Sequence, residues 1–223
     1  MRQALGEQRL KAIYDRVAPR YDWQHAFLTA HSDQRGRELL VDRAVTEGDK
    51  VLDCGAGTGS TGLRAAHKAG PSGRVTLIDV SEGMLAVARN KAAQEQLLES
   101  VEFVTGDMLE LPFEDDVFDV VLSTYSMCPV YDPAGAAAEV FRVTRPGGRI
   151  GVANSTDPEG RFTKWLAERV ENVVWKLPSV SLGCRAVSVL PTLENLGCRT
   201  VFKTRIGVPL WPFQVFVVER PTA

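Results

Sequence analysis

Three glycines alternate with other residues in the segment Asp53–Ser60, which reads Asp-Cys-Gly-Ala-Gly-Thr-Gly-Ser. The segment follows the apolar pair Val51-Leu52 and precedes a stretch that we predict to be helical. Because glycine has no side chain, the backbone can turn tightly here and approach a ligand closely. The pattern therefore predicts a nucleotide-type cofactor site at the end of a first strand.

The glycine spacing does not by itself choose the cofactor. Residues 57–62 satisfy the G-x-G-x-x-G pattern of dinucleotide-binding proteins, and an acidic residue, Asp79, follows at the end of a second predicted strand. However, the carboxylate of Asp53 would repel a pyrophosphate at the glycine loop, whereas it would attract a ligand with a cationic end. Asp53 thus favours a cationic cofactor, and an NAD-dependent oxidoreductase is kept as an alternative.

Composition sets limits on the class of protein. The chain has 223 residues, of which 44% are hydrophobic and 24% charged, as expected for one globular domain with a substantial core. The net charge of −2 gives no electrostatic case for a nucleic-acid partner. The sequence shows neither a stretch of about 20 apolar residues nor a signal-peptide core, so we expect a cytoplasmic protein.

The spacing of the cysteines also fits a cytoplasmic protein. The four cysteines have no C-x-x-C spacing, which fits a reducing compartment and gives no metal-ligand pattern. We therefore predict no bound metal.

Strand and helix signals alternate after residue 49. Strands are predicted at 51–54, 74–80, 101–105, 117–124 and 149–153, and helices at 61–69, 81–98 and 134–144. Such alternation is typical of a parallel sheet covered by helices on both faces. Two further β-rich segments, 199–206 and 213–219, are joined too closely for a crossover helix, so we expect them to pair antiparallel.

These elements together predict an α/β fold. We expect a Rossmann-like, seven-stranded, mostly parallel sheet with an antiparallel C-terminal strand and helices on both faces. Residues 1–48 have helical patterns, with a break at Pro19, and are predicted to form an extension or lid on the domain of residues 49–223. Segments 162–175 and 189–196 also read as helices.

Five motifs in register carry a family resemblance. They are Tyr14–Asp22, the glycine segment, Asp79, Gly106-Asp107-Met108 and Arg145–Gly148. With them the chain resembles the class I S-adenosylmethionine (SAM)-dependent methyltransferases, within them the UbiE/COQ5-like branch that methylates ubiquinone and menaquinone precursors. The resemblance is good over residues 12–153 and covers the remainder only in outline.

The resemblance implies SAM as the cofactor and assigns roles to residues. Asp79 would bind the ribose hydroxyls, and Asp107 with Met108 would contact the adenine edge. Ser123, Thr124 and Tyr125 would lie beneath the sulfonium and face the acceptor, while Tyr14 and Tyr21 would close the pocket. The implied cofactor-binding residues are Tyr21, Asp53, Cys54, Gly55, Gly57, Gly59, Asp79, Val80, Met84, Asp107, Met108 and Ser123.

The chain departs from the family pattern after the fourth predicted strand. It reads Ser126-Met127-Cys128-Pro129-Val130 where the quinone-methylating branch tends to carry an Arg-Asn pair. The apolar character of this segment suggests a pocket for a lipophilic acceptor. The general base is left open among Tyr125, Asp132, Asp157, His25 and His31.

The sequence therefore predicts a metal-independent SAM methyltransferase for a small lipophilic acceptor, best matched by a quinone-type precursor. Transfer to a phospholipid amine is an alternative, because an amine needs only one deprotonation and residues 182–194 vaguely resemble bacterial phospholipid N-methyltransferases. A SAM-fold interaction protein without catalysis is a further alternative. Peripheral membrane contact is left open, as is the choice between monomer and homodimer.

Overall fold

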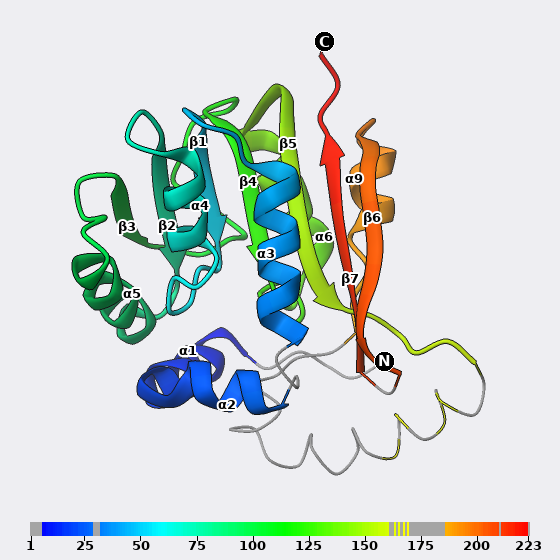
Figure 1. The fold of residues 1–223 in the computed structure, drawn as a ribbon. Coiled ribbons are helices and arrows are strands. Elements are labelled where there is room, and N and C mark those ends of the chain that lie inside the picture. The colour runs from blue at the N-terminus through cyan, green and yellow to red at the C-terminus, as the bar shows by residue number, and fades with distance from the viewer. Residues whose placement is uncertain are drawn as a thin grey trace.

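The computed structural model describes residues 6–28, 32–160, 163, 165, 167, 169, 186–209 and 211–222. Its centre is a seven-stranded sheet with the strand order β3-β2-β1-β4-β5-β7-β6 (Figure 1). The strands are β1 (Lys50–Cys54), β2 (Arg74–Asp79), β3 (Val101–Thr105), β4 (Phe118–Thr124), β5 (Thr144–Ser155), β6 (Arg199–Val208) and β7 (Trp211–Glu219). The predicted α/β architecture is confirmed.

Strand direction changes only at β7. The first five strands pair in parallel, whereas β7 pairs antiparallel with both of its neighbours, β5 and β6. The predicted C-terminal hairpin is therefore confirmed. Its second strand joins the parallel part of the sheet, and its first strand forms the outer edge.

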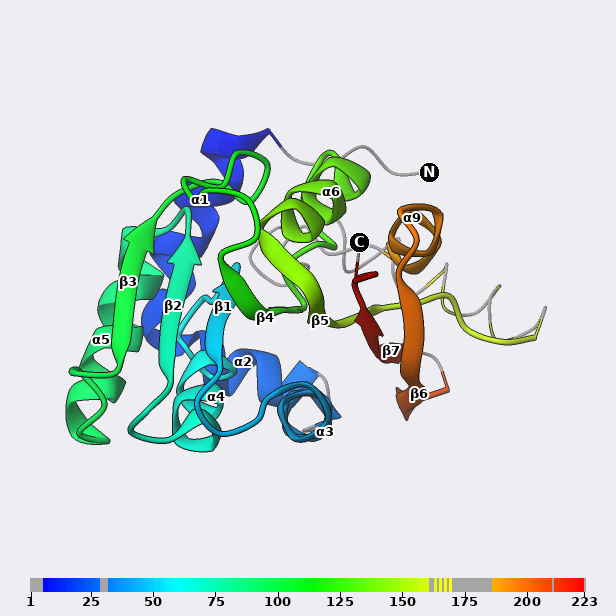
Figure 2. The same cartoon turned by 90° about the horizontal axis from the view of Figure 1, so that it is seen from above.

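Helices cover both faces of the sheet (Figure 2). One face buries a hydrophobic cluster under α3, α4 and α5, and the other buries a second cluster under α6 and α9. The bounds of these helices are α3 (Ser32–Ala44), α4 (Gly62–Ala69), α5 (Glu82–Gln94), α6 (Pro133–Val143) and α9 (Leu190–Asn195).

Local signals set several helix ends. The Ser81 hydroxyl caps α5 by accepting a hydrogen bond from the Met84 N–H at 3.1 Å, as its type and position predict. The predicted helix to residue 98 is too long, because α5 ends at Gln94 and Gln96 adopts a left-handed backbone with φ of 59°.

The two N-terminal helices lie apart from these layers. Helix α1 (Glu7–Val17) and helix α2 (Tyr21–Leu28) are joined by a short 3₁₀ turn that contains Pro19. Both cross the end of the sheet at which the parallel strands finish (Figure 1). In contrast, Leu40 and Val41 of α3 belong to the main hydrophobic core.

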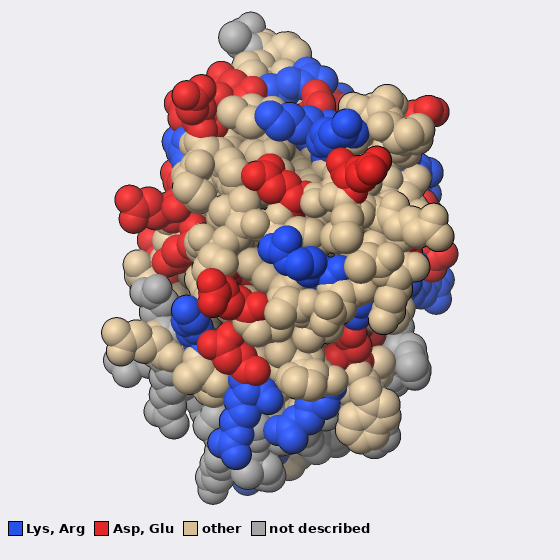
Figure 3. Space-filling view, turned by 90° about the vertical axis from the view of Figure 1, so that its left-hand side faces the viewer, with Lys and Arg blue, Asp and Glu red and all other residues tan. Residues whose placement is uncertain are grey.

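The surface charges, the helix lengths and the C-terminal third complete the description of the fold. The face over β3 and α5 carries interspersed basic and acidic side chains (Figure 3). Among the helices described, none has both the length and the apolar character needed to cross a membrane. The helix predicted at 162–175 lies outside the described residues, apart from the four single positions given above.

Candidate functional site

A pocket that opens to solvent lies at the carboxyl ends of the central parallel strands. The chain leaves β1 toward β2 and leaves β4 toward β5, so strand order reverses between β1 and β4. Ligands bind at such a reversal in open α/β sheets, because the loops there diverge to opposite faces. The pocket is lined by Leu10, Tyr14, Tyr21, Gly55, Gly57, Ile78, Asp79, Val80, Met84, Gly106, Asp107, Met108, Leu109, Thr124, Tyr125, Ser126, Pro129, Val130 and Tyr131.

The three loop glycines have different tasks. Gly55 has φ of +73°, and a Cβ there would lie 2.4 Å from the Cβ of Ser126, so no other residue fits. Gly57 lines the pocket, and a Cβ on it would meet nothing within 4 Å. Gly59 is absent from the pocket wall described above; a Cβ on it would lie 3.0 Å from that of Ala88. Gly59 therefore permits close packing of α5.

The carboxylate of Asp79 joins the glycine loop to the end of β2. One oxygen accepts a hydrogen bond from the Gly57 N–H at 2.8 Å, and the other accepts one from the Ser81 N–H at 2.9 Å. Burial raises the pKa of Asp79, while these two N–H donors oppose the rise. Each oxygen can accept a second hydrogen bond. Asp79 thus holds the glycine loop to the end of β2 and keeps capacity to accept hydrogen bonds from a ligand.

Asp53 lies behind the glycine loop and not on the pocket wall. It is fully buried, and neither carboxylate oxygen has a hydrogen-bond partner in the described part of the chain. Burial raises the pKa of Asp53 to about 7, while the charge of Arg37 and the nearby backbone N–H of Gly62, which does not reach hydrogen-bond geometry, oppose the rise. A buried, unsatisfied carboxylate is stabilised by positive charge nearby. This arrangement suits a cationic ligand above the loop.

A buried arginine that the sequence analysis missed connects the loop to β4. Arg37 of α3 donates hydrogen bonds to the hydroxyls of Thr61, at 2.8 Å, and Thr124, at 2.7 Å. Its guanidinium also lies over the ring of Tyr125, 5.1 Å from the centroid. Because Thr124 lines the pocket, the network fixes one wall of the site from beneath.

Tyr125 was predicted to face the acceptor and to be a candidate base. Its hydroxyl instead donates to the backbone oxygen of Asp33 at 3.3 Å, and its ring packs edge-on against Phe213. Burial also raises the pKa of this phenol above its usual range. The buried hydroxyl is thus engaged with α3, which argues against Tyr125 as a proton acceptor even though the residue contributes to the wall.

The other candidate bases receive no support from the geometry. Asp132 accepts the Gly135 N–H at 2.9 Å as the N-cap of α6, and Asp157 is exposed. Neither is among the described residues of the pocket wall. His25 lies in α2 with a side chain outside the described part, and His31 lies outside the described residues.

Ser123 lies behind Ser126, which takes its place on the wall. The two hydroxyls are 2.6 Å apart, and the Ser126 hydroxyl donates to the backbone oxygen of Cys54 at 2.9 Å. The Cys54 side chain is buried in the core, as are Met127 and Cys128. Pro129 and Val130 reach the pocket, as does Tyr131, which the sequence analysis did not single out.

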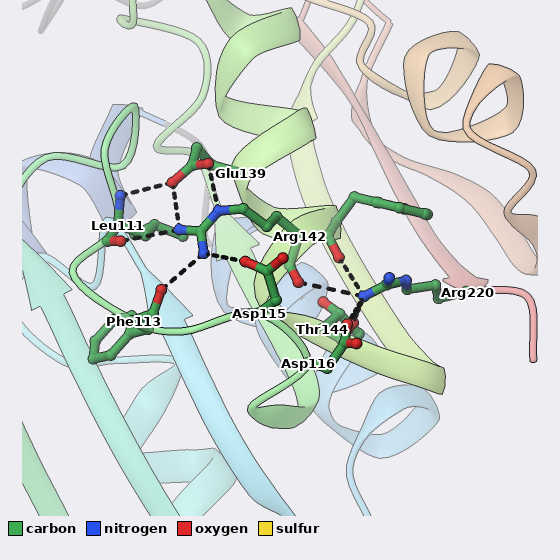
Figure 4. Close-up of polar contacts among 9 residues, drawn as sticks. Leu111, Phe113, Asp115, Asp116, Glu139, Arg142, Thr144 and Arg220 are labelled. Atoms are coloured by element: carbon green, nitrogen blue, oxygen red, sulfur yellow. Dashed lines mark hydrogen bonds and ion pairs between the residues drawn. The ribbon is translucent and has the colours of Figure 1, made fainter. Parts of the chain in front are cut away.

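The polar side of the pocket is anchored through the loop that follows Asp107 and Met108. Arg142 of α6 donates to the carboxylates of Glu139 and Asp115 and to the backbone oxygens of Leu111 and Phe113 (Figure 4). The hydrogen bonds that Glu139 accepts from Arg142 and from the Leu111 N–H lower its pKa. The bonds from Arg142 to the backbone oxygens of Leu111 and Phe113 also hold this irregular loop in place beside the pocket.

A second arginine ties the end of the same loop to the C-terminus. Arg220 pairs with Asp116 and donates to the backbone oxygen of Thr144 (Figure 4).

Over the residues that the structure describes, no group of three or more His, Cys, Asp and Glu side chains could hold a metal ion.

Comparison with known proteins agrees with this geometry. Residues 2–168 match the ubiE/COQ5 methyltransferase family. The chain belongs to this family. Two relatives in the same family are a demethylmenaquinone methyltransferase of Symbiobacterium thermophilum, 31% identical over 160 residues, and a ubiquinone/menaquinone biosynthesis C-methyltransferase UbiE of Roseobacter denitrificans, 34% identical over 143 residues.

The matches to these ubiE/COQ5 relatives are partial. They cover 71% and 64% of this chain, but only 64% and 57% of the relatives' own lengths. The match to the family itself, over residues 2–168, includes the glycine loop, Asp79 and the N-terminal helices, and it ends before α9 and the hairpin.

Solved structures share the fold of this ubiE/COQ5 chain. A [4+2]-cyclase, SpnF, superimposes with a TM-score of 0.77 at 19% identity and covers 100% of this chain and 99% of its own. A geranyl diphosphate methyltransferase in complex with SAM has a TM-score of 0.67 at 17% identity, covering 84% and 85% of the two chains. At such identities the likeness concerns the fold alone.

Proposed function

We propose that this protein is a SAM-dependent methyltransferase for a small lipophilic acceptor of the quinone-precursor type. The observation that carries the proposal is one pocket with two unlike walls. The polar wall holds the motif residues Asp79 and Asp107, and the apolar wall holds Pro129 and Val130. Such a pocket can bring a polar cofactor and a lipophilic acceptor side by side.

The residues of the polar wall fit SAM. Asp79, Asp107 and Met108 all line the pocket, so Asp79 could accept hydrogen bonds from a ribose diol while Asp107 and Met108 contact the adenine edge. Gly57 presents no side chain to the pocket, and a Cβ on it would meet nothing within 4 Å. Behind the loop, Asp53 supplies a carboxylate that lacks hydrogen-bond partners in the described part of the chain. When bound, SAM supplies a methyl group on an already activated sulfonium.

The protein's own contribution is to orient the acceptor and exclude water. Methyl transfer is an in-line displacement, so holding the acceptor atom in line supplies much of the rate enhancement. Tyr14 and Tyr21 of the N-terminal helices line the pocket, which supports a role for them in covering the bound cofactor. We therefore include α1 and α2 in the proposal as a lid.

The wall chemistry also restricts the acceptor. Within the described part of the wall no Lys, Arg or His occurs. An acceptor bearing phosphate or carboxylate would find no cationic partner there, whereas a neutral aromatic acceptor would find apolar contacts. The names of the relatives favour a quinone precursor and give no support to a phospholipid amine or to NAD.

The fold alone does not decide the activity, because SpnF, a [4+2]-cyclase, shares it. A direct test incubates the purified protein with methyl-labelled SAM and an extract of the source cell, then separates quinones, phospholipids and water-soluble products. We expect label in the quinone fraction. Label confined to phospholipids would show that the acceptor is a phospholipid and not a quinone precursor. Label only in water-soluble products would refute both lipophilic acceptors.

Three accompanying proposals concern the setting of the enzyme. We propose that it acts in the cytoplasm, as a monomer or homodimer, and reaches its lipophilic acceptor by peripheral contact with a membrane. Sedimentation with lipid vesicles measures that contact, and sedimentation velocity measures the oligomeric state.

A further inference from the structure

Two Tyr-Asp pairs occur seven residues apart in the N-terminal helices, as Tyr14-Asp15 and Tyr21-Asp22. In each pair the tyrosine lines the pocket, and the two rings lie 6.2 Å apart between centroids. In each pair the aspartate hydrogen-bonds to a part of the domain that holds the cofactor pocket. Each Tyr-Asp pair therefore combines a tyrosine on the pocket wall with an aspartate that anchors the helix to the domain.

Asp22 joins three elements through one carboxylate. Its Oδ1 accepts a hydrogen bond from the Thr58 hydroxyl at 2.5 Å, and the Ser60 hydroxyl lies 3.4 Å from the same oxygen. Its Oδ2 lies 2.5 Å from Nζ of Lys91 on α5. Thr58 is buried and directly follows Gly57, so Asp22 holds the glycine loop one residue from the pocket wall.

Asp15 makes the corresponding contact at the end of β2. Its Oδ1 accepts a hydrogen bond from the Ser81 hydroxyl at 2.5 Å and lies 3.3 Å from the backbone nitrogen of Gly83. The Ser81 N–H in turn donates to Asp79. Ser81 thus connects the carboxylate of α1 with the carboxylate that we expect to bind the ribose.

We propose that Asp15 and Asp22 are positioning residues that latch α1 and α2 to the two cofactor-binding loops. The identity of the cofactor rests on the proposed function, whereas the latch itself is made within the chain. Bonds from hydroxyl or ammonium donors to a carboxylate are charge-assisted and therefore stronger than neutral ones. Ordering of the loops by a ligand then fixes Tyr14 and Tyr21 over it, and release of the latch frees both.

The latch predicts a change in backbone protection without any ligand. In Asp22→Ala we expect the amides of residues 7–28 to exchange hydrogen for deuterium about tenfold faster, because local opening becomes easier. Asp42→Ala is the matched control: Asp42 also lies on a helix and pairs with a lysine, Lys68, at 3.6 Å. The control should leave exchange in residues 7–28 unchanged. Unchanged exchange in Asp22→Ala would overturn the latch.

A double-mutant cycle separates the latch from a general loss of helix stability. Thr58→Val removes only the hydroxyl that donates to Asp22. We expect the double variant to exchange about as fast as Asp22→Ala alone, because each of the two changes breaks the same hydrogen bond between Thr58 and Asp22. Independent, additive effects would contradict a latch through Thr58. Should Thr58→Val fail to fold, Lys91→Met repeats the cycle from α5.

Ligand release provides the functional readout. We expect SAM and S-adenosylhomocysteine to dissociate about tenfold faster from Asp22→Ala than from the wild type in stopped-flow experiments, with a smaller change in association. If the wild type binds SAM and the variant releases it at the same rate, the latch is wrong and the proposed function stands. If the wild type binds neither ligand, the proposed function is wrong, and hydrogen exchange still decides the latch.

Discussion

Replacing Asp53 by Asn should remove a pH dependence from the stability of the free protein. Asp53 is completely buried, and its carboxylate oxygens lack hydrogen-bond partners among the residues described. Burial raises its pKa from 3.8 to about 7. The native state therefore holds a proton that the unfolded state releases between about pH 4 and pH 7. In this window stability falls as the pH rises, and above pH 7 the contribution is lost.

The size of the effect follows from the two pKa values. Between pH 5 and pH 8, a group with a native pKa of about 7 and an unfolded pKa of 3.8 changes the free energy of unfolding by roughly 2–3 kcal/mol. A buried Asn amide costs about 1–3 kcal/mol if unpaired, but this cost does not vary with pH. The informative quantity is therefore the difference in the free energy of unfolding between wild type and Asp53→Asn at each pH.

Urea unfolding at pH 5, 6, 7 and 8 measures that difference for the protein without ligand. We expect the variant to gain roughly 2–3 kcal/mol relative to the wild type between pH 5 and pH 8. Asp42→Asn, on the exposed pair with Lys68, should follow the wild-type curve within about 0.5 kcal/mol. Parallel curves for Asp53→Asn and the wild type would refute the account of the buried carboxylate.

Three further predictions concern the same region. Arg37→Met should lower the free energy of unfolding at pH 8 by about 3–5 kcal/mol, and by less at pH 5 where Asp53 is protonated, as urea unfolding would measure. Gly36→Ala should cost about 1–3 kcal/mol because its Cβ would lie 2.3 Å from the Tyr125 hydroxyl oxygen, and adding Tyr125→Phe should recover part of this loss. Asp79→Ala should weaken SAM binding at least about tenfold in calorimetry, and unchanged affinity would place the ribose elsewhere.

The sheet and the position of the pocket were predictable because their signals are local. Alternating apolar segments identify the strands, and the cap at Ser81 and the glycines at 55–59 identify the loops around the pocket. Parallel strands place their carboxyl ends at one edge, so the loop after β1 and the end of β2 had to meet there. The hairpin followed from the short connection between its strands.

Other features depend on contacts between distant parts of the chain. Arg37 bonds to Thr61 and Thr124, which lie 24 and 87 residues away, and nothing in the helix that carries it marks it as buried. The tyrosine at 125 could be placed after β4, but its direction depends on Gly36 of α3. The sequence supplies these residues without showing which of them meet.

The position of Asp53 was in part accessible from the sequence. Successive side chains of a strand point to opposite faces, so Asp53 shares the face of Val51, which packs under α3 and α4. Applied to β1, this alternation places the carboxylate behind the glycine loop. Asp53 is therefore buried behind the loop and is not part of the described pocket lining, so under our proposal it would act on a cationic ligand electrostatically, through the loop.

The central claim is that the pocket binds SAM, and calorimetric titration of the purified protein with SAM, S-adenosylhomocysteine and NAD tests it most directly. The account predicts that both SAM and S-adenosylhomocysteine bind at one site per chain, and that NAD gives no binding heat. Binding of NAD without binding of SAM would contradict it.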